Sequence, residues 1–165
     1  MATASLAQAL PPEMTTLRTQ PLFIFQVEVK PPSIIGACPG YDRRVGEITG
    51  GRFEGERLRG RILSGGSDWQ SLRADGTTTL NVRLVMETDD GELIGMTYLG
   101  MRHGPKEVME RIGRGEKVSP SEYYMRATPY YETASQKYGW LNRIASVAYG
   151  HRMAGGAIYQ VFEVL

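Results

Sequence analysis

The chain has 165 residues, which suits one domain and leaves little for a second. Its 19 basic and 18 acidic residues give a net charge of +1. Binding to nucleic acid through bulk electrostatics needs a clear basic surplus and is therefore not expected. Apolar residues make up 41% of the chain, which excludes disorder throughout.

The first 19 residues give no strong signal for a fold, and Pro11-Pro12 interrupts them. The first basic residue is Arg18, and no apolar run of ~7 to 15 residues precedes it, so we expect no secretory signal. No stretch approaches the ~20 apolar residues of a transmembrane helix, and we expect no membrane partner. These patterns predict a flexible tail over residues 1–19 and one folded domain over 20–165, in the cytoplasm.

Alternation of apolar and polar residues with period two predicts that most of this domain is β-structure. The first such segment is 23–29, and Asp89-Asp90-Gly91 is a turn signal between two later segments. The predicted strands cover residues 23–29, 58–63, 80–87, 93–99, 123–133, 144–149 and 157–165.

One helix is predicted after Gly104-Pro105, because proline is well suited to the start of a helix. Val108, Met109 and Ile112 then share one face, and Gly113 offers a C-terminal cap. Many short strands with one helix favour an antiparallel sheet that closes into a β-barrel, because closure removes exposed sheet edges. A barrel of about eight strands is filled by side chains or holds one small ligand. A two-sheet sandwich is the alternative.

The segment Gly65-Gly66-Ser67-Asp68-Trp69-Gln70 is the most distinctive in the chain. Its glycines allow a sharp turn or a close approach to a ligand. We expect Asp68, as a proton acceptor, and Trp69, as a stacking wall, to lie at one pocket rim in the barrel mouth. The alternative is a tight hairpin in which Asp68 caps backbone N–H groups and Trp69 is in the core.

Asn81 and Arg83 share one face of their predicted strand. If the apolar face packs under the helix, these two residues line the lumen and bind an anionic or carbonyl oxygen of a ligand. If the apolar face fills the lumen, Arg83 is merely solvated. We expect the first arrangement, in which Arg83 and Arg102 stabilise a developing enolate or phenolate.

Other side chains complete the expected site. Tyr98 and Trp140 would form ligand walls, and Tyr124 belongs to a tyrosine pair of which one member could reach a pocket. His103 is a candidate general base, or else a hydrogen-bonding turn residue. Glu132 is a further candidate for proton transfer.

No metal site and no cofactor are expected. Two histidines and the single cysteine, Cys38, are a poor ligand set for zinc, and no phosphate-cradling loop is present. One cysteine also excludes an internal disulfide, which fits a reducing compartment. The expected partner is a small molecule, and homo-oligomerisation stays open.

Six short segments occur together in an order that resembles the family known as domain of unknown function 3237. They are Arg43-Arg44, Thr49-Gly50-Gly51-Arg52-Phe53, Gly65 to Gln70, Thr88-Asp89-Asp90-Gly91, Gly104-Pro105 and Trp140-Leu141-Asn142-Arg143. The resemblance implies a calycin-like or lipocalin-like barrel with a lumen open at one end. Members occur beside genes of aromatic catabolism and secondary metabolism, which implies a small organic ligand. The chain departs from the family at Asn81, where an acid is usual, and at Ser64, where a proline is usual.

Three functions are compatible with these patterns. The first is a cofactor-independent lyase, isomerase or cyclase that acts on a small oxygenated aromatic or polyketide-like molecule. The second is a binding or carrier barrel without turnover. The third is an assembly protein with a filled lumen. A titratable carboxyl group that faces the lumen would favour the enzyme.

Overall fold

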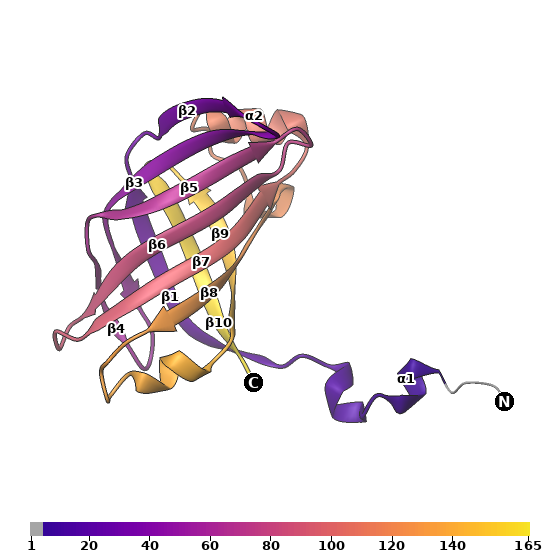
Figure 1. Ribbon diagram of the computed structural model, residues 1–165, viewed down its shortest axis with the longest axis vertical. Coiled ribbons are helices and arrows are strands. Elements are labelled where there is room, and N and C mark those ends of the chain that lie inside the picture. Colours follow the sequence, from indigo (N-terminus) through magenta and orange to yellow (C-terminus); the bar gives the residue numbers. More distant parts are fainter. Residues whose placement is uncertain (1–4) are drawn as a thin grey trace.

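The computed structural model describes residues 5–165, and residues 1–4 lie outside the described range (Figure 1). Ten strands dominate this range. The strands are β1 (Thr19–Val29), β2 (Ser33–Cys38), β3 (Tyr41–Glu54), β4 (Arg59–Ile62), β5 (Gly66–Arg73), β6 (Thr78–Thr88), β7 (Leu93–His103), β8 (Tyr124–Glu132), β9 (Ser146–Met153) and β10 (Gly156–Val164). The helices are α1 (Leu6–Ala9) and α2 (Lys106–Gly113), with 3-10 turns η1 (Pro12–Thr15), η2 (Pro120–Glu122) and η3 (Gly139–Arg143).

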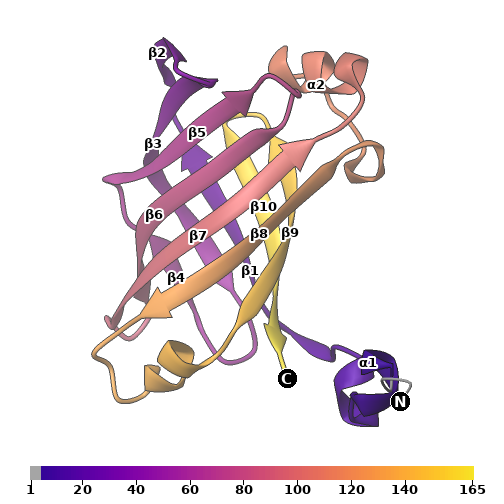
Figure 2. The same ribbon diagram turned by 45° about the vertical axis from the view of Figure 1, so that its right-hand side comes forward.

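The strands close into an antiparallel barrel, as predicted. The neighbours run β1-β10-β9-β8-β7-β6 and continue through β4 and β5 to β3, which pairs with β1. Both β4 and β5 pair with β3 and β6, at different ends, so they share one of eight positions around the barrel. The β2–β3 hairpin extends beyond the barrel at the α2 end (Figure 2). A closed ring of pairings excludes the two-sheet sandwich.

Seven of these strands were predicted, and β2, β3 and β5 were not. The sequence of β3 contains three glycines and several charged residues, which break the period-two signal. The glycines serve its geometry, because a Cβ at Gly51 would collide with the backbone carbonyl oxygen of Gln26 on β1. Local propensity therefore misses a strand that close backbone packing requires.

The barrel interior is divided along its axis into a packed half and a hollow half. In the packed half, Phe23 lies within 6.1 Å of Phe25, 6.0 Å of Phe53 and 6.0 Å of Tyr131 between ring centroids. This end is covered by η3, whose Leu141 is buried, while α2 lies at the opposite end (Figure 1). Burial of these aromatic rings anchors the barrel and leaves the α2 end free for a site.

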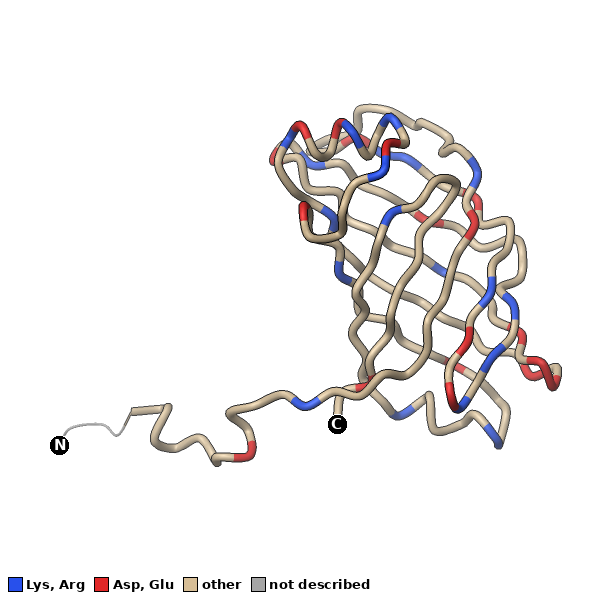
Figure 3. The backbone as a smooth tube through the Cα atoms, turned by 180° about the vertical axis from the view of Figure 1, so that it is seen from behind, with Lys and Arg blue, Asp and Glu red and all other residues tan. Residues whose placement is uncertain are grey.

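The predicted helix is α2, with Pro105 as the residue before its first turn. Val108 is buried, and Met109 and Ile112 pack partly against the core, so the predicted face is the one that meets the barrel. Charged residues of both signs follow the rest of the helix (Figure 3). The helix covers part of the hollow end.

The N-terminal segment leaves the barrel beside the C-terminus (Figure 3). Within residues 5–18 it contains α1 and η1, and every residue is exposed. It therefore contributes nothing to the barrel core.

Gly51→Ala is expected to destabilise the fold by about 2 kcal/mol, because its φ of +147° disfavours side chains and the new Cβ would press on β1. The matched control is Gly113→Ala in α2, where a Cβ meets nothing within 4 Å. This control substitution should raise the free energy of unfolding by about 0.5 to 1 kcal/mol, because alanine is favoured over glycine in helices. Urea denaturation of both variants measures the difference, and equal stabilities would contradict the close approach of β3 to β1.

Candidate functional site

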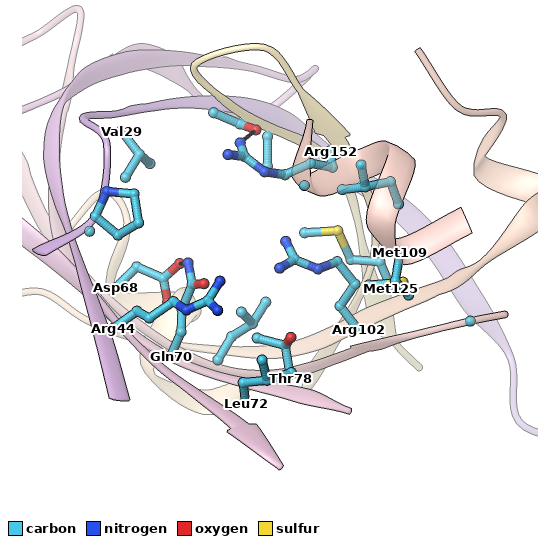
Figure 4. A pocket seen from close by; sticks show the side chains of 18 of the residues that line it. Val29, Arg44, Asp68, Gln70, Leu72, Thr78, Arg102, Met109, Met125 and Arg152 are labelled. Carbon is cyan, nitrogen blue, oxygen red and sulfur yellow. Dashed lines mark hydrogen bonds between the residues drawn. The ribbon is translucent and has the colours of Figure 1, made fainter. Parts of the chain in front are cut away.

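The hollow half of the barrel contains a cavity of about 900 Å³ that opens beside α2 (Figure 4). This volume is in the range of sites for small organic molecules. Its walls come from β1, β3, β5, β6, β7 and the β9–β10 hairpin. Thr78 and Met125 add to the wall near the mouth (Figure 4).

Two buried tyrosines lie where the cavity meets the packed half. Tyr98 of β7 and Tyr159 of β10 have ring centroids 5.5 Å apart, and Phe25 stacks on Tyr159 at 4.7 Å. Burial raises the pKa of both phenols. Each hydroxyl therefore stays protonated at neutral pH. Tyr98, for which we predicted a role as a ligand wall, lies at this boundary.

Asp68 projects from β5 into the cavity (Figure 4). The amide of Gln70 donates a hydrogen bond of 2.6 Å to Oδ2, whereas Oδ1 is buried and has no partner in the described chain. Burial raises the pKa of this carboxyl group, and the Gln70 hydrogen bond and the charges of Arg102 and Arg152 offset part of the effect. A carboxylate with a free oxygen and a raised pKa is suited to accept a proton from a bound molecule.

Three arginines converge on the same cavity. Arg44 of β3, Arg102 of β7 and Arg152 of β9 point into it from different sides (Figure 4). The Nε atoms of Arg44 and Arg102 are buried without a hydrogen-bond partner in the described chain. Burial lowers the pKa of Arg102, and the like charge of Arg152 lowers it further. Guanidinium groups stay protonated in proteins, so the cavity presents positive charge to a ligand.

Arg44, Gln70 and Arg152 were not predicted as site residues. Gln70 carried a usable signal, because it lies two residues after Asp68 and therefore shares its face of any strand. Arg44 and Arg152 carried no comparable signal. Each is one of two neighbouring basic or imidazole residues, and only the strand register shows which of the two points inward.

The prediction that Asp68 and Trp69 share one pocket rim was wrong. Successive residues of a strand point to opposite faces, so Asp68 enters the lumen while Trp69 faces outward with 46% of its surface exposed. The indole Nε1 donates to Ser67 on the outer face. Only the Asp68 half of the pair belongs to the cavity.

The placement of Asn81 and Arg83 in the lumen was also wrong. Leu80, Val82 and Leu84 of β6 are buried inside the barrel, which turns the alternate residues outward, and both Asn81 and Arg83 are exposed. The apolar face fills the lumen, which is the alternative stated above. Asn81, where the resemblance implies an acid, therefore lies outside the cavity, and this departure does not remove a base from the lumen.

Four further predicted residues lie away from the cavity. His103 and Tyr124 are exposed on the outer face, where their rings stack at 4.9 Å. Glu132 is exposed on the outer face of β8, beside Gly95 of β7. Trp140 belongs to η3 at the packed end, with the Arg57 guanidinium 4.0 Å from its ring.

A second hollow of about 900 Å³ lies on the outer face of the sheet. Trp69, Asn81 and Tyr124 line it together with Tyr149 and Arg126, whose guanidinium lies 3.4 Å from the Tyr149 ring. Three of the predicted ligand-binding residues are thus near one another, but outside the barrel. Among the residues predicted to contact a ligand, Arg102 and Tyr98 line the lumen.

The chain matches the family model described as "Protein of unknown function (DUF3237)" over residues 17–164. It belongs to the DUF3237 family. A UPF0311 protein of Rhodopseudomonas palustris is 32% identical over 150 residues, which cover 91% of this chain and 98% of that protein. Its crystal structure, described as a conserved protein of unknown function, superposes with a TM-score of 0.86.

Two other solved structures share the barrel. A beta-barrel like protein of Acinetobacter baumannii has 37% identity and a TM-score of 0.81, over 94% of this DUF3237 chain and 99% of that one. An enzyme from Penicillium herquei has a TM-score of 0.70 over 92% of this chain and 96% of that one. Its identity is 19%, so the likeness concerns the fold alone.

Within residues 5–165, no group of three or more His, Cys, Asp or Glu side chains is placed to hold a metal ion. Over the same residues, none of the helices has the length and apolar character needed to span a membrane.

The stability contribution of Asp68 is expected to depend on pH. Its folded-state pKa lies above the ordinary 3.8, so the folded protein binds the proton more tightly than the unfolded chain. Wild-type stability therefore falls as pH rises through the folded-state pKa, because the buried carboxylate must then be charged. Asp68→Asn has no such charge, and its stability relative to wild type should increase from pH ~4 to pH ~7.

Melting temperatures from pH ~2 to pH ~7 measure this trend. Asp75→Asn is the control of opposite sign, because the backbone N–H of Thr77 holds the Asp75 pKa below its ordinary value. That variant should lose stability relative to wild type as pH rises to ~4, where Asp75 of the unfolded chain titrates, and should then change little up to pH ~7. Parallel curves for the two variants would contradict the assignment of Asp68 as a destabilised buried carboxylate.

Proposed function

We propose that this protein is a cofactor-independent enzyme of the lyase, isomerase or cyclase type. Its substrate is a small oxygenated aromatic or polyketide-like molecule bound in the barrel lumen, and we place the reaction in the cytoplasm. The observation that carries the proposal is the unpartnered Oδ1 of Asp68 in a cavity that also holds unpartnered guanidinium groups. A base and an anion-stabilising group that share one cavity are the two requirements for proton abstraction beside a carbonyl.

In the proposed reaction, the Asp68 carboxylate accepts a proton from a carbon next to a substrate carbonyl. The electron pair of that C–H bond moves onto the carbonyl oxygen, which becomes an enolate. Arg102 donates hydrogen bonds to this oxygen from a site that excludes much of the water, which strengthens the interaction. Asp68 then returns the proton to another carbon, to a leaving group or to the oxygen of a new ring, and the carboxylate is restored.

The aromatic or cyclic character of the substrate is supported by the cavity floor. Tyr98 and Tyr159 are among the residues that line the cavity, and aromatic rings that carry hydroxyl groups suit a flat oxygenated molecule. The fold is also compatible with catalysis, since it is shared with the Penicillium herquei protein that is described as an enzyme. The second candidate is a carrier barrel, which would use the same tyrosines and arginines and would not need Asp68 as a base.

The test follows proton exchange at carbon. The protein is incubated in D₂O with cyclic 1,3-diketones and phenolic β-keto esters, and deuterium incorporation or rearrangement is followed by NMR. Asp68→Asn should lower the rate by about 10²- to 10⁴-fold, the range of general-base catalysis, while ligand affinity changes little. Asp89→Asn, at an exposed turn, is the matched control and should keep full activity. Activity should persist after exhaustive treatment with EDTA.

Each alternative has its own signature in this experiment. Binding without exchange for every compound would favour the carrier barrel. Exchange that survives Asp68→Asn would remove Asp68 as the base. Activity that disappears with EDTA and returns with a metal would overturn the cofactor-independent mechanism.

A further inference from the structure

We propose that the lumen takes a dianion, with one acidic group bound at Arg44 and the other at Arg102. This inference rests on the proposed function only for the location of the site. It narrows the substrate class to molecules with two anionic oxygen groups, such as aromatic dicarboxylates or a carboxylate combined with an acidic enol.

The two arginines stand on different walls. Arg44 lies on β3, opposite Gln70 of β5, whereas Arg102 lies on β7, opposite Thr78 of β6 and Met125 of β8. Their guanidinium groups point toward each other across the open space of the cavity (Figure 4). A single compact anion at one wall would leave the arginine of the other wall without a partner.

Neither guanidinium group has a hydrogen-bond or ion-pair partner among the described residues. No side-chain hydrogen bond or ion pair of Arg44 or Arg102 occurs among residues 5–165, and the Nε atom of each is buried. A guanidinium group has five N–H donors in a fixed plane and matches the two oxygens of a carboxylate. Burial of such donors without acceptors is costly, and a ligand carboxylate would remove that cost.

The charges around the cavity also favour a ligand with two negative charges. Arg44, Arg102 and Arg152 face the single carboxylate of Asp68, which leaves an excess of two positive charges inside. Four charged residues at the rim do not change the balance, because they are two of each sign: Lys30, Asp75, Lys106 and Glu110. A monoanion would leave one half-buried positive charge uncompensated, and a dianion leaves none.

Arg152 has a different position from the other two. Its Nη1 donates to the backbone carbonyl oxygens of Met153 and Gly156, so part of its hydrogen-bonding capacity holds the β9–β10 turn. It adds positive charge above the ligand, while Arg44 and Arg102 keep all their donors free. The two free arginines therefore define the two anchoring points.

The experiment compares ligands that have one shape and different charge. Benzene-1,3- and benzene-1,4-dicarboxylate are titrated into the full chain by isothermal calorimetry, each beside its monoamide, which has one negative charge fewer. At least one dicarboxylate should bind about tenfold more tightly than its monoamide. Arg44→Gln and Arg102→Gln should each weaken dicarboxylate binding by about 10- to 100-fold, as loss of a charged hydrogen bond does, and reduce the preference to within threefold.

Two variants serve as controls. Arg83→Gln removes an exposed arginine on the outer face and should leave both affinities unchanged. Arg44→Lys keeps the charge and should retain part of the preference, and circular dichroism confirms that each variant is folded. The proposal is overturned if neither dicarboxylate is preferred over its monoamide, or if the preference survives in Arg44→Gln or Arg102→Gln.

The outcome is independent of the proposed enzymatic activity, because binding is measured without turnover. Asp68→Asn removes the base and also one negative charge from the cavity, so it should abolish proton exchange while the preference for the dianion persists or increases. A dianion preference without proton exchange would contradict the enzyme and leave this inference standing. Proton exchange without a dianion preference would contradict this inference and leave the enzyme proposal standing.

Discussion

The constraint on which the whole molecule depends is the alternation of side chains along strands of a closed barrel. Every strand residue points either into the lumen or away from it, and its neighbours point the other way. In the packed half, the inward positions carry aromatic and aliphatic side chains such as Phe23 and Met86. Toward α2, the inward positions become Asp68, Gln70 and Arg102, and the core changes into a site.

The two halves of the barrel therefore have different roles. The packed half supplies the burial of apolar surface that stabilises the fold. The hollow half keeps charged atoms without hydrogen-bond partners in the described chain, which reduces stability and leaves these atoms free for the ligand that we propose. A rigid floor of Tyr98 and Tyr159, held by stacking with Phe25, joins the two and fixes the depth to which a ligand can enter.

The sequence predicted the barrel and α2 because their signals are local. Periodicity identifies β6 and β7, and the Gly104-Pro105 pair marks the start of the helix. The strand β3 was missed because its glycines are needed for close packing on β1, which is distant in sequence. Arg44 was missed with it. The errors at Trp69 and Arg83 concern which face of a strand is inward, and this depends on what the opposite walls contribute.

Asp68 and Gln70 lie on β5, which shares its place in the barrel wall with the separate strand β4. The link between them is short and is held by backbone bonds from Leu63 to Val85 and from Gly65 to Ile48. The part of the cavity wall that carries Asp68 is therefore a separate strand between β3 and β6. The aromatic packing lies beside β4. Sequence change in this part of the wall can alter the chemistry of the cavity while the packed half of the barrel stays as it is.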